Sequence, residues 1–173
     1  MDFSFDRTVS ILERTPPVLG ALLTGLDPAL TLGNYGPGTW SAYQAVGHLI
    51  VGEREDWIPR ARIILGHGTA RPFAPFPHDA AIHPESGRTL DDLLDEFAAV
   101  RSDNLVALRG LGITPAELDL RGRHPALGEV TLAQLLATWA AHDLHHIRQI
   151  CRAIAWQSRE LVGPWRAYIN TLG

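Results

Sequence analysis

Apolar residues recur every three or four positions along four long stretches of the chain, and this spacing predicts four α-helices. The predicted helices span about residues 4–25, 41–65, 89–110 and 131–156. No segment shows the alternation of apolar and polar residues that indicates a β-strand. The pattern therefore predicts an all-α four-helix bundle, formed by a single domain over residues 1–173.

Signals at the helix ends support this division. Ser41, Thr89 and Thr131 each stand where a hydroxyl can cap the first turn of a helix. Proline interrupts two of the patterns, because it lacks a backbone N–H and its ring clashes with the preceding turn. We therefore expect a break or kink at Pro16–Pro17 in the first helix and a kink at Pro59 in the second.

A long connection rich in proline and glycine, residues 66–88, separates the second and third helices. A connection of this length can cross the whole bundle, so that the third helix runs in the same direction as the second. Its Phe73 and Phe76 are candidates for a lid or a pocket wall, the alternative being a plain crossover. Residues 122–128 are expected to form a loop, and residues 163–170 a short final helix.

Composition excludes some classes of protein. The net charge is −4, lysine is absent and the 15 arginines are scattered, so no basic face for nucleic acid is visible. No apolar run is long enough to span a membrane, and no signal peptide is recognisable. We expect a cytoplasmic protein that acts on a small molecule. The single cysteine, Cys151, lies among apolar residues in the middle of the fourth helix and is expected to be an inert core residue.

The chemistry of the chain centres on histidine. His142 and His146 are four residues apart, so that a helix places them on one face, and that face also carries Trp139 and Ile150. His48, beside small residues in the second helix, is the natural third member. Three imidazoles at one point can bind a divalent metal ion and leave a position open for chemistry. The alternative is that each histidine simply bonds to a carbonyl or carboxylate of a neighbouring helix.

Other polar residues are weaker candidates. Asp56 could reach a cavity near His48, and Asp143 could orient a ligand on a facing helix, so both are candidates for acid–base work. Glu55 is expected to form ordinary surface ion pairs. His145 falls on a more polar face and is assigned to the rim or the surface. The remaining histidines, His67, His78, His83 and His124, fall in predicted loops and are expected to be solvated.

Several segments resemble the DinB-like (DinB/YfiT) superfamily. They are residues 40–41, 47–50, 53–57, 122–128, 135–139, 142–147 and 163–168. The resemblance covers nearly the whole chain, from about Phe5 to Tyr168. It implies a four-helix bundle with up-down-down-up connections, which suits the long crossover.

The resemblance also implies chemistry. It implies that His48, His142 and His146 hold a divalent metal ion, often zinc or nickel, and that the protein forms dimers, as many members do. Known activities in the superfamily include transferases and isomerases that depend on a low-molecular-weight thiol. The three-histidine pattern is typical of the superfamily but not of any one reaction.

Two classes of function follow. The first is a small-molecule metalloenzyme, namely a thiol-dependent S-transferase, an isomerase or a hydrolase that uses an open three-histidine site. The second is a non-catalytic, stress-associated metal-binding or interaction module with a structural metal. The coordination sphere separates them, because a structural site is closed by a fourth protein ligand.

Overall fold

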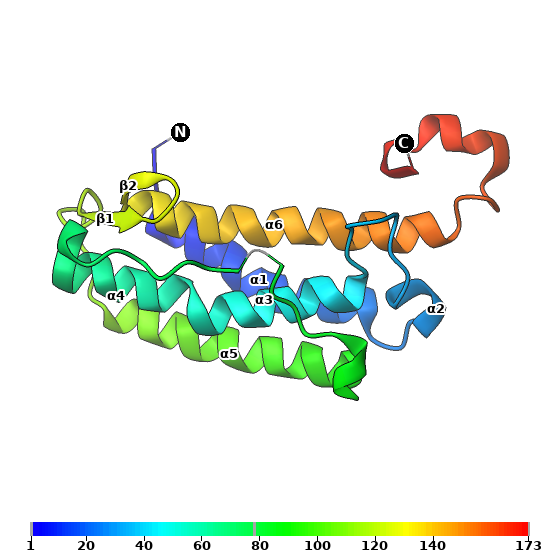
Figure 1. The fold of residues 1–173 in the computed structure, drawn as a ribbon, viewed down its shortest axis with the longest axis horizontal. Coiled ribbons are helices and arrows are strands. Elements are labelled where there is room, and N and C mark those ends of the chain that lie inside the picture. The colour runs from blue at the N-terminus through cyan, green and yellow to red at the C-terminus, as the bar shows by residue number, and fades with distance from the viewer. Residues whose placement is uncertain (1, 78, 173) are drawn as a thin grey trace.

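The computed structural model describes residues 2–77 and 79–172. In it, four long helical segments pack side by side (Figure 1). The long helices are α1 (Phe5–Leu23), α3 (Ala42–Glu55) continued by α4 (Trp57–His67), α5 (Leu90–Gly110) and α6 (Leu132–Gln157). Helices α1 and α6 run in one direction, whereas α3–α4 and α5 run in the other (Figure 1). The predicted four-helix bundle with a crossover between its second and third helices is confirmed.

Shorter elements occupy the connections and the C-terminal end. They are α2 (Pro28–Thr31), the 3₁₀ helices η1 (Gly68–Ala70), η2 (Pro84–Ser86), η3 (Gly163–Tyr168) and η4 (Asn170–Leu172), and the strands β1 (Arg121–His124) and β2 (Gly128–Thr131). The predicted final helix is thus two 3₁₀ turns. Among the described residues, none of the helices is both long and apolar enough to cross a membrane.

The prediction that the chain has no strand, with a loop over residues 122–128, is wrong. Strands β1 and β2 pair in antiparallel fashion, from Arg121 opposite Thr131 to His124 opposite Gly128. Each strand has only four residues, which is too short for an alternating pattern to stand out. Gly128, at φ +77°, takes the left-handed conformation that closes such a short hairpin.

The second predicted helix is divided in two. Helix α3 ends at Glu55 and α4 begins at Trp57, with Asp56 between them. Pro59 lies inside α4, and a proline ring clashes with the carbonyl four residues earlier, here that of Glu55. The helix is therefore interrupted at Asp56, about one turn before the proline that was predicted to kink it.

The break predicted at Pro16–Pro17 does not occur, since α1 is continuous through both prolines. Pro16 has no N–H to donate to the carbonyl of Leu12, four residues earlier. That carbonyl instead accepts a hydrogen bond of 2.9 Å from Arg101 of α5. A side chain from another helix thus replaces one bond that proline removes.

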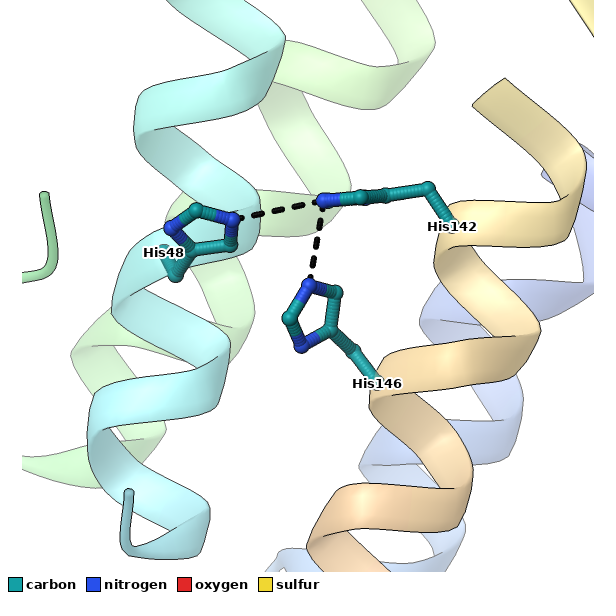
Figure 2. A group of neighbouring side chains, drawn as sticks. All are labelled: His48, His142 and His146. Atoms are coloured by element: carbon teal, nitrogen blue, oxygen red, sulfur yellow. Dashed lines mark hydrogen bonds between the residues drawn. The ribbon is translucent and has the colours of Figure 1, made fainter. Parts of the chain in front are cut away.

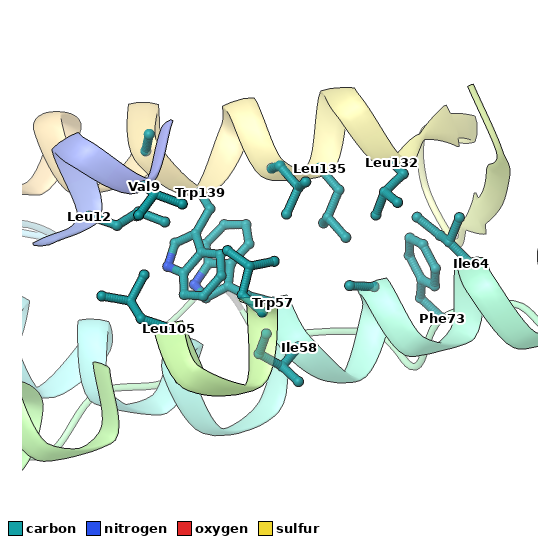
Figure 3. Close-up of a cluster of buried hydrophobic side chains, with 14 residues drawn as sticks. Val9, Leu12, Trp57, Ile58, Ile64, Phe73, Leu105, Leu132, Leu135 and Trp139 are labelled. Carbon is teal, nitrogen blue, oxygen red and sulfur yellow. The ribbon is translucent and has the colours of Figure 1, made fainter. Parts of the chain in front are cut away.

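The apolar core consists of two clusters at opposite ends of the bundle. One is centred on Trp57 and Trp139, whose rings stack 5.8 Å apart (Figure 3). The other gathers around Tyr43, Leu49 and Phe97. Burial of these side chains supplies the main favourable term in folding.

A layer of buried polar residues lies between the two clusters, and each of the four helical segments contributes one member. These members are Thr15 of α1, Glu53 of α3, Arg101 of α5 and Asp143 of α6. Arg101 bonds both oxygens of Asp143, at 2.6 and 2.9 Å, and one oxygen of Glu53, at 2.8 Å. Thr15 donates to Asp143 at 2.6 Å. The layer therefore ties together all four helices.

Neighbouring side chains complete the bonding of Glu53. Trp139 donates its indole N–H to this carboxylate at 2.8 Å, and Asn104 donates to it at 3.0 Å. Burial disfavours the charge of Arg101, but the two carboxylates outweigh this effect and raise the pKa of Arg101 above its ordinary value. Removing Arg101 would leave two buried carboxylates without their cation, which is far more costly than losing an exposed ion pair.

We therefore expect Arg101→Met to lower the free energy of unfolding by about 3–5 kcal/mol. Arg109→Met is the matched control, because Arg109 lies on the same helix and pairs with Glu13 at the half-exposed surface. Its loss should change stability by less than about 1 kcal/mol. Denaturant unfolding of the three proteins measures both effects. Equal stabilities of the two variants would contradict the role given to the buried layer.

Candidate metal centre

Three imidazoles from two helices converge on one point. His48 comes from α3, and His142 and His146 come from successive turns of α6 (Figure 2). The Nε2 atom of His142 lies 3.3 Å from Nε2 of His48 and 3.0 Å from Nε2 of His146. One ligand nitrogen from each residue lies within 4.8 Å of the others, so the three could hold one metal ion. The structure thus brings together the three histidines that the sequence singles out.

The outward-facing nitrogens of two of these rings have fixed partners. Nδ1 of His48 lies 2.7 Å from the carbonyl oxygen of Ala80, and Nδ1 of His146 lies 2.7 Å from Oε1 of Gln149. A carbonyl oxygen can only accept, so each Nδ1 carries the proton. Both rings therefore turn an Nε2 lone pair toward the shared point, which is the arrangement that a metal ligand requires.

His142 is held in a different way. Its Nδ1 is buried and has no hydrogen-bond partner among the described residues. The ring packs edge-on against Trp57, with the ring centres 5.2 Å apart. Its orientation is therefore set by packing, through the same tryptophan that stacks on Trp139 in the apolar core.

His142 and His146 stay neutral in the folded protein well below neutral pH. Burial, and then the neighbouring His146 and His48, lower the pKa of His142 to about 3. Burial and His48 lower the pKa of His146 to about 4, although its bond to Gln149 opposes the shift. Because only neutral imidazole binds a metal, the fold keeps these donors in the binding form well below neutral pH.

Aromatic rings enclose the histidine group on the side away from the core. Trp40 stacks near His146, with ring centres 5.9 Å apart, and approaches His48 at 4.6 Å. Phe76, from the crossover, meets His48 edge-on at 5.7 Å. Electrostatic interactions are stronger in such apolar surroundings than in water.

A cavity of about 980 Å³ opens beside the histidines. Its wall is shared by α3, α4, α6, the crossover and the hairpin β1–β2. Phe73 and Phe76 both line it, which confirms the predicted role of the crossover as a pocket wall. His124 was expected to be a solvated loop residue, but it lies half-buried in β1, lines the cavity and meets Phe73 edge-on.

The acidic candidates separate in the structure. Asp56 is buried, lines the cavity and forms an ion pair with Arg60, which also lines it. Asp143 belongs to the buried polar layer and does not line the cavity, so the predicted contact with a ligand on a facing helix is not found. Residue periodicity explains this, because Asp143 directly follows His142 and therefore points to another side of α6. Glu55 is exposed, but none of the ion pairs found among the described residues includes it.

The remaining candidates lie outside the centre. His145 is exposed at the rim of the cavity, as expected. His67 and His83 are exposed, and His78 lies outside the described residues. Cys151 was expected in the interior, but it is exposed. It follows Ile150, which is fully buried, and one step along a helix turns the side chain by about 100°.

Sequence reasoning missed the residues that support the centre. Gln149 could have been found, because it lies three residues after His146 and therefore on the same helix face. Trp40 lies immediately before the helix cap Ser41, and nothing in its spacing indicates a contact with His146. The carbonyl of Ala80 carries no signal in the sequence, since any residue supplies one.

Comparison with solved structures places the chain among known four-helix bundles. YfiT from Bacillus subtilis, described as a probable metal-dependent hydrolase with an unusual four-helix bundle topology, superposes with a TM-score of 0.75. The match has 21% sequence identity and covers 92% of this chain and 90% of YfiT. TT2238, a four-helix bundle protein, matches with a TM-score of 0.56 and 21% identity, over 86% of this chain and 98% of that one. No curated protein matches in sequence.

The sequence itself matches a family model. The model describes the DinB superfamily, and the match covers residues 11–150. These residues include the three histidines, all of α3, α4 and α5, and most of α1 and α6. On this evidence, the chain belongs to the DinB superfamily.

Proposed function

We propose that this protein is a metal-dependent enzyme that acts on a small molecule, with His48, His142 and His146 as the ligands of one divalent ion. One observation carries the proposal: three imidazole nitrogens meet beside a cavity of about 980 Å³. Within the described residues, this ligand group contains three protein donors and no fourth. Three donors beside an open space are typical of catalytic sites, and four of structural ones.

The donor set favours particular metals. Neutral imidazole is a good ligand for zinc, nickel, copper and iron, whereas magnesium and calcium prefer oxygen ligands. We propose zinc or nickel. A divalent ion held here supplies Lewis acidity, which polarises an electrophile and favours deprotonation of a thiol or of water.

The chain's own residues would perform the remaining tasks. His48 and His146 present fixed lone pairs. Trp40 and Phe76 pack against the imidazoles, and Asp56 is a carboxylate at the cavity wall. An ionised carboxylate can accept a proton from an incoming nucleophile. We assign this role to Asp56, because Asp143 is committed to Arg101.

Two reaction types fit the open position. With water as the nucleophile the reaction is hydrolysis, and the structural likeness to YfiT, a probable metal-dependent hydrolase, supports this choice. With a low-molecular-weight thiol the reaction is S-transfer or thiol-assisted isomerisation. The apolar, aromatic wall formed by Trp57, Phe73 and Phe76 favours a substrate with an apolar body in either case.

A non-catalytic role is the competing proposal. An ion bound here would join α3 to α6 and so could serve only to hold the bundle together. This role needs the metal for folding, whereas the enzyme needs it for turnover. Metal content, pH dependence and metal removal test the two proposals.

The first test is metal content. His48→Ala, His142→Ala and His146→Ala should each reduce bound metal from about one ion per chain to near zero, because two imidazoles alone hold a divalent ion weakly. His145→Ala is the control, since His145 lies at the exposed rim. Elemental analysis of the purified proteins gives the answer. Full metal retention by the His142 or His146 variant would sink the ligand assignment.

The second test uses pH. Histidine in the unfolded chain has a pKa near 6.5, whereas the pKa values of folded His142 and His146 are lowered to about 3 and about 4. Between these values the unfolded state binds more protons, so stability of the metal-free protein is lost as the pH falls from about 6.5. The slope reaches about 1.4 kcal/mol per pH unit for each histidine. Below the pKa values of folded His142 and His146, the free energy of unfolding falls no further on their account.

Denaturant titrations of the metal-free protein between pH 7 and pH 5 measure this slope. His142→Leu should make it shallower, because one depressed pKa is removed. His67→Ala is the control, because this histidine lies at the exposed surface and outside the buried group. Identical slopes in all three proteins would show that the buried histidines do not remain neutral.

The third test is metal removal. Chelation should abolish turnover of thiol–electrophile pairs or of hydrolysable esters and amides. The helices should persist, because the two apolar clusters and the Arg101 layer do not include the three histidines. Far-UV circular dichroism and a thermal melt follow the fold. Outright unfolding on chelation would instead support the structural role.

A further inference from the structure

The end of the crossover, residues 79–83, lies along one face of α3. The contacts follow helical spacing: Gln44 bonds the ring of His83 at 3.2 Å, and one turn later His48 bonds the carbonyl of Ala80 at 2.7 Å. Just before Gln44, the hydroxyl of Tyr43 bonds the carbonyl of Arg88 at 3.0 Å. Together, these contacts fix the end of the crossover to the helix that carries His48.

Gly47 lies between these contacts and allows the two chains to approach closely. A Cβ atom added to Gly47 would lie 2.6 Å from the backbone nitrogen of Ile82 and 2.9 Å from its carbonyl oxygen. Distances below 3.0 Å essentially never occur for real Cβ atoms, and the atoms met here are backbone and not the tip of a flexible side chain. Any residue other than glycine at this position must displace residues 79–83 or α3.

Glycine in the interior of a helix is unfavourable compared with alanine, so its presence in α3 calls for a local reason. We propose that Gly47 is a positioning residue of the metal centre. By admitting the backbone of Ile82, it holds the carbonyl of Ala80 against Nδ1 of His48. That bond keeps the proton on Nδ1 and the lone pair on Nε2, where the ion binds. The inference rests on the proposed metal site.

The crossover is the part that would yield to a larger residue. Helix α3 is fixed on its other side, because Glu53 bonds both Arg101 and Trp139 in the buried layer. Residues 79–83 take no part in that layer, and Ile82 packs only partly buried against the apolar cluster around Tyr43, Leu49 and Phe97. Displacement of these residues would separate Ala80 from His48. The ring could then carry its proton on Nε2, in the tautomer that cannot bind the ion through that nitrogen.

The test compares Gly47→Ala with Gly20→Ala by zinc competition against a chromophoric chelator. Loss of an outer hydrogen bond to a ligand histidine typically weakens metal binding by about 10–100-fold, and we expect this loss for Gly47→Ala. Gly20 lies inside α1 with nothing within 4 Å of an added Cβ, so its variant gains the same helix propensity without the clash. It should bind zinc like the parent protein. An affinity of Gly47→Ala within about threefold of the parent overturns the inference.

A second measurement tests the parent protein by itself, so that its outcome does not depend on how the variant folds. Long-range ¹H–¹⁵N correlation spectra of the metal-free parent protein report which nitrogen of His48 carries the proton. We expect Nδ1–H in the parent and a shift toward Nε2–H in Gly47→Ala. A parent His48 protonated on Nε2 overturns the inference outright. Failure of the parent to bind zinc at all, with the expected Nδ1–H signal present, would refute the proposed metal function, whereas the placement of Ala80 against His48 by Gly47 would stand.

Discussion

The ion pair between Arg101 and two buried carboxylates determines how the helices align. Glu53 lies five residues after His48 on α3, and Asp143 lies between His142 and His146 on α6. Because both carboxylates bond one guanidinium, α3 and α6 cannot slide past each other without breaking a buried ion pair. The same constraint therefore sets His48 level with the two histidines of α6. Arg101 also donates a hydrogen bond to the carbonyl of Leu12, in the stretch where α1 continues through Pro16–Pro17.

Features that depend on neighbours in the chain could be predicted from the sequence. The caps at Ser41, Thr89 and Thr131 form as expected, each as a reciprocal capping box. The pair His142 and His146 needed only the helical repeat, and His48 only its place on an apolar face. Local rules failed where a residue distant in sequence took part. At Pro16, for example, Arg101 donates the hydrogen bond to Leu12 that the proline cannot donate.

Features that depend on distant partners could not be predicted. Arg101 stands within the apolar stripe of its helix, between Phe97 and Leu105, and this position is a signal of a buried charge. Its partners, however, come from two other helices, so the sequence could not identify them. The same holds for the bond between His48 and Ala80, and for the hairpin, whose strands are defined by their pairing with each other.

The crossover solves a problem of topology, since two successive helices that run in the same direction need a connection as long as the bundle. Here that connection also forms part of the cavity wall, through Phe73 and Phe76, while the three histidines project from the helices. The crossover thus supplies part of the cavity wall, whereas none of the three histidines comes from it. During evolution, a lineage could exchange or lengthen this part of the wall while the helices that carry the histidines kept their sequence, which would allow different cavities on one scaffold.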